Sequence, residues 1–216
     1  MKPTILRNVF LGLLVVAGGY VLTGCSSTGH DATGKDNRNK LLVSVSDQRL
    51  LLLRDGKPVK SYPVSTSKFG LGSRAGSNRT PLGNMEIARK IGDGQPIGMV
   101  FKGRRPTGEI LTANAPGRDP IVSRILWLHG KDRHNSNTFS RLIYIHGTAE
   151  EWRLGRPASY GCIRMGIRDV VDLYNRVGEG AEVRVIRESL LHTREDRHYT
   201  RKRLGDAGHL EFASSD

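Results

Sequence analysis

Residues 41–65 read LLVSVSDQRLLLLRDGKPVKSYPVS and contain three short runs of strand-forming residues. The runs cover residues 41–46, 49–53 and 59–64. Asp-Gln at residues 47–48 and Asp-Gly at residues 55–56 separate them, and pairs of this kind suit the tight turns of β-hairpins. The stretch therefore predicts three antiparallel strands in succession.

Further strand-like runs follow along the chain, separated by glycine-rich segments at residues 70–83 and 103–120. The runs cover residues 85–90, 99–102, 121–128, 142–145 and 181–187. One helix is indicated over residues 169–177, where four apolar residues are spaced to share one face. They are Val170, Leu173, Tyr174 and Val177. These patterns predict a mainly β domain with one or two short helices.

The composition bounds the class of protein. The chain has 216 residues, 37% of them hydrophobic, and 34 Lys and Arg against 21 Asp and Glu give a formal charge of +13. These values exclude a disordered, a collagen-like and a multispanning membrane protein. The length suits one compact core of roughly 150 residues with peripheral segments.

The N-terminus has the layout of an export signal. Lys2 and Arg7 precede an apolar run over residues 9–21, which is shorter than the ~20 residues of a spanning helix. The run leads into LTGC at residues 22–25, which resembles the lipobox of bacterial lipoproteins. The resemblance implies cleavage before Cys25 and lipidation of its sulfur. The alternatives are a transmembrane anchor and a secretory signal that leaves a free thiol.

Composition divides the rest of the chain. Residues 1–24 are the expected signal peptide, and the polar residues 25–40 are an expected flexible tether. Residues 41–187 carry the predicted strands and helix and form the folded domain. Residues 188–216 are rich in charges of both signs and are expected to form a solvated tail.

His146 and Cys162 are candidate partners in nucleophilic catalysis. They lie 16 positions apart, in YIHGT at residues 144–148 and SYGCIRM at residues 159–165. His146 ends an apolar run and Cys162 follows a glycine-containing turn, so we expect both side chains at one edge of the sheet. A neighbouring imidazole can accept the proton of a thiol and hold it as the nucleophilic thiolate. The glycine would leave turn amides free to bind an oxyanion.

Other interpretations of these residues remain open at this point. A lone cysteine is often a buried small hydrophobic residue. Papain-like and caspase-like proteases have a different order or spacing of cysteine and histidine. Zinc is disfavoured, because Cys162 with His129, His134 and His146 shows neither CxxC nor HExxH spacing.

The two motifs together resemble those of the bacterial L,D-transpeptidases of the YkuD family. The family signature is a His-Gly pair, a gap of about this size, and Ser/Thr-His-Gly-Cys followed by an apolar residue and Arg or Asn. This chain has His-Gly at residues 146–147 and SYGCIR at residues 159–164. The strand runs of residues 41–66 and the TPLG turn at residues 80–83 also match. Tyr160 departs from the family, which usually has histidine at that position.

The resemblance implies a fold and a reaction. The fold is a β-sandwich-like L,D-transpeptidase catalytic domain. Cys162 is the nucleophile, His146 is its base, and the carbonyl of Gly147 orients the imidazole. The enzyme attacks the bond between the third residue and D-Ala of a peptidoglycan tetrapeptide stem. An amine then resolves the acyl-enzyme to form a 3,3 cross-link or attach a protein; water would instead make the enzyme a carboxypeptidase.

The resemblance also implies supporting residues and partners. Ser159, Tyr160 and Gly161 support the nucleophile or the oxyanion, and Arg164 binds a substrate carboxylate or ties down the loop. No metal or organic cofactor is expected. The expected partners are peptidoglycan stem peptides and, through the N-terminal lipid, a membrane. Nucleic acid is not expected, despite the basic charge, because an exported lipoprotein does not meet it.

The expected location is the cell envelope or periplasm, on a membrane. Ser26 after Cys25 favours the outer over the inner membrane by analogy with lipoprotein sorting. The rival function is a non-catalytic envelope lipoprotein that binds wall polymers through its charge. The sequence indicates no oligomeric state.

Overall fold

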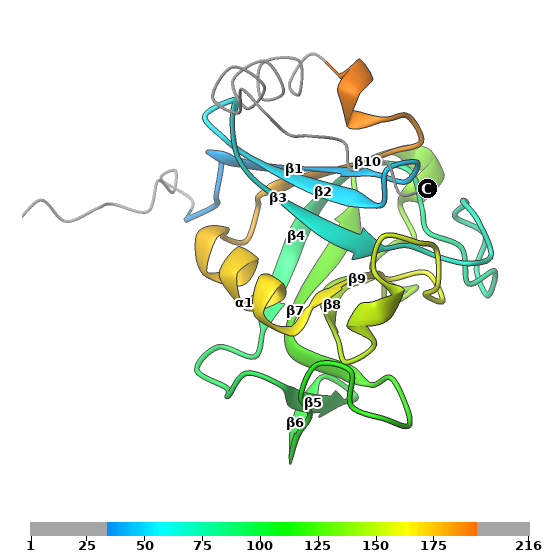
Figure 1. Cartoon of the computed structure of the whole chain (residues 1–216). Helices are drawn as coiled ribbons and strands as arrows, with labels where there is room; N and C mark the ends of the chain where they lie inside the picture. The colour runs from blue at the N-terminus through cyan, green and yellow to red at the C-terminus, as the bar shows by residue number, and fades with distance from the viewer. Residues whose placement is uncertain (1–33, 194–216) are drawn as a thin grey trace, which may run out of the picture.

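The computed structural model describes residues 34–193, which form a mainly β domain with one α-helix (Figure 1). The strands are β1 (Asn39–Ser44), β2 (Arg49–Arg54), β3 (Lys57–Ser65), β4 (Gly83–Ile91), β5 (Met99–Lys102), β6 (Arg105–Ile110), β7 (Ile121–Gly130), β8 (Tyr144–Thr148), β9 (Ile163–Gly166) and β10 (Glu182–Ile186). The helix is α1 (Ile167–Arg176), and the 3₁₀ helices are η1 (Arg133–Asn135), η2 (Glu151–Arg153) and η3 (Leu190–His192). The expected signal peptide, Cys25, Ser26 and the tail from residue 194 lie outside the described residues.

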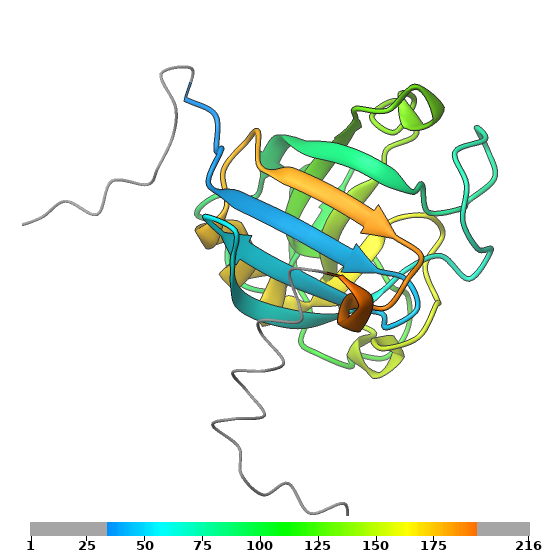
Figure 2. The ribbon, with the colours of Figure 1, turned by 90° about the horizontal axis from the view of Figure 1, so that it is seen from above.

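The sheet closes into a barrel because β4 pairs along both of its edges. The strand order is β4-β10-β1-β2-β3-β9-β8-β7, and β7 pairs with β4 again, while β5 and β6 extend from β7. The β1–β10 and β8–β9 pairs are parallel and the other pairs are antiparallel. Figure 2 shows β10, β1, β2 and β3 side by side along one wall. The predicted mainly β class is confirmed, but the sandwich-like arrangement is wrong, because closure joins eight of the strands, β1–β4 and β7–β10, into one ring.

The three runs in residues 41–65 form β1, β2 and β3 in the predicted antiparallel order. β1 and β2 carry consecutive leucines because both faces of this wall are covered. Leu41 and Leu52 face the main core inside the barrel, whereas Leu42 and Leu51 pack on the outside against Leu190 of η3. The first residues of the expected solvated tail therefore lie against the barrel.

Helix α1 buries the face that its spacing predicts, because Val170, Leu173 and Tyr174 all join the main core. The chain before β1 is also fixed to the helix end. Asp36 is buried and accepts hydrogen bonds from the backbone N–H groups of Asn39 at 3.0 Å and Gly178 at 2.7 Å. Residues 36–40, which composition assigns to the tether, are thus part of the folded structure.

Two strands lack a sequence signal. β6 reads RPTGEI, is exposed along its length and pairs only with β5. β9 has four residues, too few for a periodic pattern. The predicted run at residues 142–145 starts two residues early, because Leu142 has a φ of 58° and cannot continue a strand. Within residues 34–193 no helix is long and apolar enough to cross a membrane.

Candidate active site

The parallel pairing of β8 with β9 brings the histidine and the cysteine to one face. His146 lies opposite Arg164 in the register, and Cys162 precedes Arg164 by two residues. Side chains two positions apart on an extended chain share a face. Their neighbours in the chain, Ile145 and Ile163, point the other way, into the barrel core. His146 and Cys162 consequently line one cleft of about 450 Å³, as their place in the sequence predicts.

Hydrogen bonds within the turn before β9 position the cysteine. The Ser159 hydroxyl donates to the Cys162 carbonyl at 2.6 Å and accepts from the Gly161 N–H at 3.3 Å. The Thr80 hydroxyl donates to the Gly161 carbonyl at 3.0 Å. Gly161 has a φ of 118°, a conformation that side chains rarely adopt. Ser159 and Gly161 thus shape the turn that presents Cys162.

His146 is buried, and its protonation follows from one hydrogen bond. The Nδ1 atom lies 2.8 Å from the carbonyl oxygen of Gly147. A carbonyl oxygen can only accept, so Nδ1 carries the proton and Nε2 of the neutral ring is free to act as a base. Burial lowers the pKa of His146, while the Gly147 carbonyl and Asp119 oppose that shift. The imidazole is therefore neutral at pH 7.

The Cys162 thiol is protonated in the resting site. Burial raises its pKa to about 11, against the lowering effects of the Tyr144 backbone N–H and the Arg141 and Arg164 guanidinium groups. The thiol donates to the carbonyl of Leu142 at 3.5 Å. Sequence reasoning expected a standing thiolate, but burial opposes the charge. A nucleophilic role for this thiol would therefore require a base that takes the proton as the sulfur attacks.

Alkylation of Cys162 by iodoacetamide should require alkaline pH. Because burial raises the thiol pKa, the rate should still be rising at pH ~9.5, above the ordinary cysteine midpoint of ~8.5. Residues 26–216 contain one cysteine, so intact mass reports this site alone. Arg141→Met, which removes a cation that stabilises the thiolate, should shift the profile further upward. A midpoint below 8.5 would show a stable thiolate–imidazolium pair and contradict the protonation assigned here.

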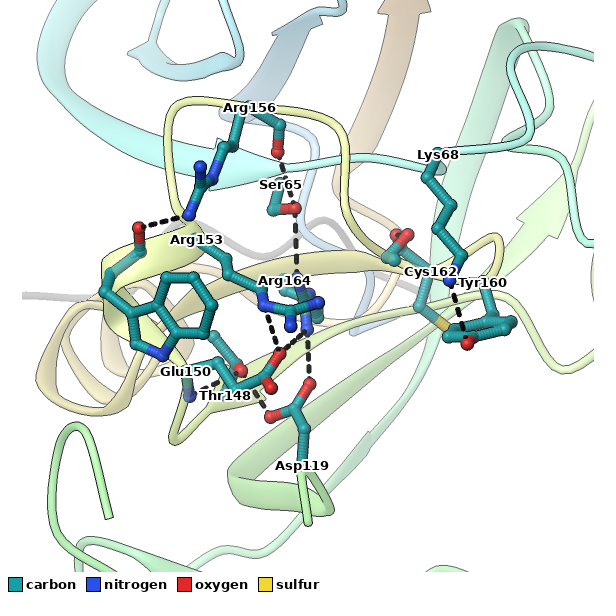
Figure 3. A network of polar contacts seen from close by, with 12 residues as sticks. Ser65, Lys68, Asp119, Thr148, Glu150, Arg153, Arg156, Tyr160, Cys162 and Arg164 are labelled. Carbon is teal, nitrogen blue, oxygen red and sulfur yellow. Dashed lines mark hydrogen bonds and ion pairs between the residues drawn. The ribbon is translucent and has the colours of Figure 1, made fainter. Parts of the chain in front are cut away.

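Arg164 ties down the loops around the site (Figure 3). Its buried guanidinium pairs with Asp119 and, at 3.0 Å, with Glu150, and it also donates to the Ser65 hydroxyl at 3.3 Å. Thr148, at the end of the histidine strand, donates its hydroxyl to Asp119. With two carboxylates already bound, the cation is neutralised. Loop anchoring, one of the two roles expected for Arg164, is what these contacts show, and binding of a substrate carboxylate stays a prediction.

Asp119 and Glu150 are site residues that sequence reasoning missed. Asp119 is the second-last residue of the segment 103–120, Glu150 follows the histidine strand, and both line the cleft with Arg164. Isolated acidic residues in a charged chain carry no motif. A buried arginine two residues from the candidate nucleophile requires acidic partners, however, and this requirement is the one available signal.

Tyr160 lies at the rim of the same cleft, with 64% of its surface exposed. Its hydroxyl accepts a hydrogen bond from the Lys68 ammonium at 2.9 Å, and its ring lies 5.4 Å from that of Phe69. The phenol is therefore exposed to solvent and held by Lys68 and Phe69.

The segment 70–83 is fixed beside the cleft by Arg141. The guanidinium donates to the carbonyls of Gly72 at 3.2 Å and Arg79 at 2.7 Å. This placement brings a positive charge toward the Cys162 sulfur, as its effect on the thiol pKa indicates. In the described part of the chain, no three His, Cys, Asp or Glu residues are grouped to hold a metal ion.

Comparison with known proteins identifies similar chains. The family profile described as YkuD, L,D-transpeptidase catalytic domain, matches residues 38–185. A Bacillus licheniformis protein that bears the name L,D-transpeptidase YkuD is 26% identical over 147 residues. These residues are 68% of this chain and 64% of that protein. The chain thus spans less than two thirds of that relative's length.

Solved structures that are similar to this chain include two mycobacterial proteins. An L,D-transpeptidase from Mycobacterium smegmatis is 15% identical with a TM-score of 0.45, covering 69% of this chain and 58% of that one. L,D-transpeptidase 3 from Mycobacterium tuberculosis, solved with a faropenem-derived adduct, is 19% identical with a TM-score of 0.45, covering 70% and 60%.

Proposed function

Since the chain belongs to the YkuD family of L,D-transpeptidase catalytic domains, we propose that it transfers peptidoglycan stem peptides through an acyl-enzyme on Cys162. The observation that carries the proposal is that His146, with its Nδ1 held by the Gly147 carbonyl, lines the same cleft as Cys162. A non-catalytic binding protein would need neither the imidazole orientation nor the shared cleft.

Acylation begins with the neutral pair. The sulfur of Cys162 attacks the carbonyl of the third stem residue as Nε2 of His146 accepts the thiol proton. The Tyr144 N–H, Arg141 and Arg164 stabilise negative charge on the sulfur. The tetrahedral intermediate breaks its C–N bond, and the imidazolium returns the proton to the leaving D-Ala amine. The product is a thioester on Cys162.

The thioester is resolved by a second nucleophile. An acceptor amine attacks the carbonyl, His146 accepts a proton from the amine, and the C–S bond breaks to release an amide. The proton on the imidazolium then returns to the sulfur. We expect the backbone N–H groups of Tyr160 and Cys162, in the turn before β9, to bind the oxyanion in both steps. Water in place of the amine would give carboxypeptidase activity.

Residues 26–216, incubated with tetrapeptide muropeptides, should yield 3,3-linked dimers and released D-Ala. Attack of the acceptor amine on the thioester competes with hydrolysis by water at ~55 M. The cleft must therefore hold the amine at the thioester carbonyl, which raises the effective molarity of the amine. The dimer share, measured by mass spectrometry, should rise with acceptor concentration. If tripeptide is the only product at every acceptor concentration, the enzyme is a carboxypeptidase that uses the same two residues, and not a transpeptidase.

The proposed setting is the cell envelope or periplasm, on a membrane. The family acts on the cell wall, so the domain works outside the cytoplasm. The export-signal layout and the LTGC sequence at residues 22–25 support a lipid on Cys25, and Ser26 supports the outer membrane.

A further inference from the structure

Lys68 and Tyr160 form a contact at the rim of the cleft that the proposed chemistry does not use. The Lys68 ammonium lies 2.9 Å from the Tyr160 hydroxyl oxygen and 4.3 Å from the centre of its ring. Phe69 packs against the same ring, and the two aromatic residues are 44% and 64% exposed. Figure 3 shows Lys68 reaching across to Tyr160 beside Cys162.

The positive charges of Arg153 and Arg164 are paired with carboxylates, whereas within residues 34–193 the charge of Lys68 is not. Arg164 pairs with two carboxylates, and Arg153 pairs with Glu150 at 3.2 Å. Among the carboxylates of residues 34–193, none lies within 4.0 Å of the Lys68 ammonium. An unneutralised cation at the rim of a reactive cleft is suited to an anionic group of the ligand.

The hydrogen-bond arrangement leaves donors facing outward. The ammonium donates one N–H to the phenol oxygen, which leaves it two further N–H groups. The phenol O–H is free to donate to a third group, and the same lysine contact lowers the pKa of Tyr160 and strengthens it as a donor. One carboxylate can accept from both side chains at once, one oxygen to each.

We propose that Lys68 and Tyr160 together bind a carboxylate of the donor peptide beside the scissile bond. This subsite rests on the proposed function. The carboxylate of the leaving D-amino acid fits best, because only the leaving nitrogen and one carbon separate it from the attacked carbonyl. Tyr160 precedes the nucleophile by two residues and lines the same cleft. A side-chain carboxylate of the stem is the other source of the same chemistry.

Binding without turnover tests the subsite. Cys162→Ala in residues 26–216 is titrated calorimetrically with three tetrapeptides: the free acid, its C-terminal amide, and a stem amidated at the side-chain carboxylate. The free acid should bind about tenfold more tightly than the C-terminal amide, as for a charge-assisted hydrogen bond. Adding Lys68→Met to Cys162→Ala should reduce the ratio of the two affinities to about one. Adding Tyr160→Phe should reduce it to about three. Lys57→Met, an exposed lysine outside the cleft, should leave the ratio unchanged.

Each result decides the proposal. If Lys68→Met instead abolishes the preference for the free stem over the stem amidated at its side chain, the subsite binds the side-chain carboxylate of the stem. If the variant leaves every ratio unchanged while its thermal melt matches the parent, the subsite does not exist. If no stem peptide binds at all, the proposed function fails, and N-acetyl-D-alanine against its amide then decides the subsite separately.

Discussion

Replacing Cys162 with alanine is expected to lower turnover of tetrapeptide stems by at least about 10⁴-fold. The variant lacks the atom that forms the thioester, and no general base can compensate for a missing nucleophile. The fold should survive, because the thiol is small and lies at the edge of the core rather than within it. Its loss should change the unfolding free energy by about 1 kcal/mol or less.

Cys162→Ser is the matched control. It keeps the size of the side chain, but a hydroxyl is much harder to deprotonate than a thiol, and the neutral His146 should activate it poorly. Intact mass should show an acyl adduct on the wild-type protein and none on the alanine variant. If the alanine variant released D-Ala at close to the wild-type rate, the nucleophile would have to lie elsewhere.

The parts of the fold that sequence could predict are those fixed by local interactions. Asp-Gln and Asp-Gly turns join neighbouring runs, so β1, β2 and β3 follow from residues 41–65 alone. The face of α1 repeats within two turns of one helix. Barrel closure instead depends on β4 pairing with both β10 and β7, and nothing local in Met85 or Ile87 specifies two partners.

The site divides in the same way. His146 and Cys162 stand in recognisable motifs, and strand alternation places them on one face. Their protonation depends on burial by segments far away in sequence, so the direction of the thiol pKa could not be predicted. Likewise, Lys68 meets Tyr160 across 92 positions, and neither residue signals the other.

Replacing Arg164 with methionine is expected to destabilise the fold by about 3 kcal/mol. Methionine fills much of the space, but it leaves the Asp119 and Glu150 carboxylates facing each other without their cation. Removing one partner of a buried ion pair costs about 3–5 kcal/mol, and the lower end applies because both carboxylates keep some solvent contact, at 17% and 18% exposure. The melting temperature should fall by roughly 6–12 °C.

A double-mutant cycle separates this charge effect from lost packing. Asp119→Asn alone removes one of the two carboxylates that pair with Arg164. In the Arg164→Met background, the same substitution removes a charge that repels the Glu150 carboxylate. The double variant should therefore be more stable than the sum of the two single losses, by about 1 kcal/mol or more. Arg168→Met, an exposed arginine on α1, should stay within about 0.5 kcal/mol of wild type. Equal melting temperatures for Arg164→Met and Arg168→Met would mean that the ion pairs do not hold the loops. If the stability losses of the two single variants simply add up in the double variant, the loss in Arg164→Met comes from packing. Repulsion between the two carboxylates cannot act once one of them is neutral.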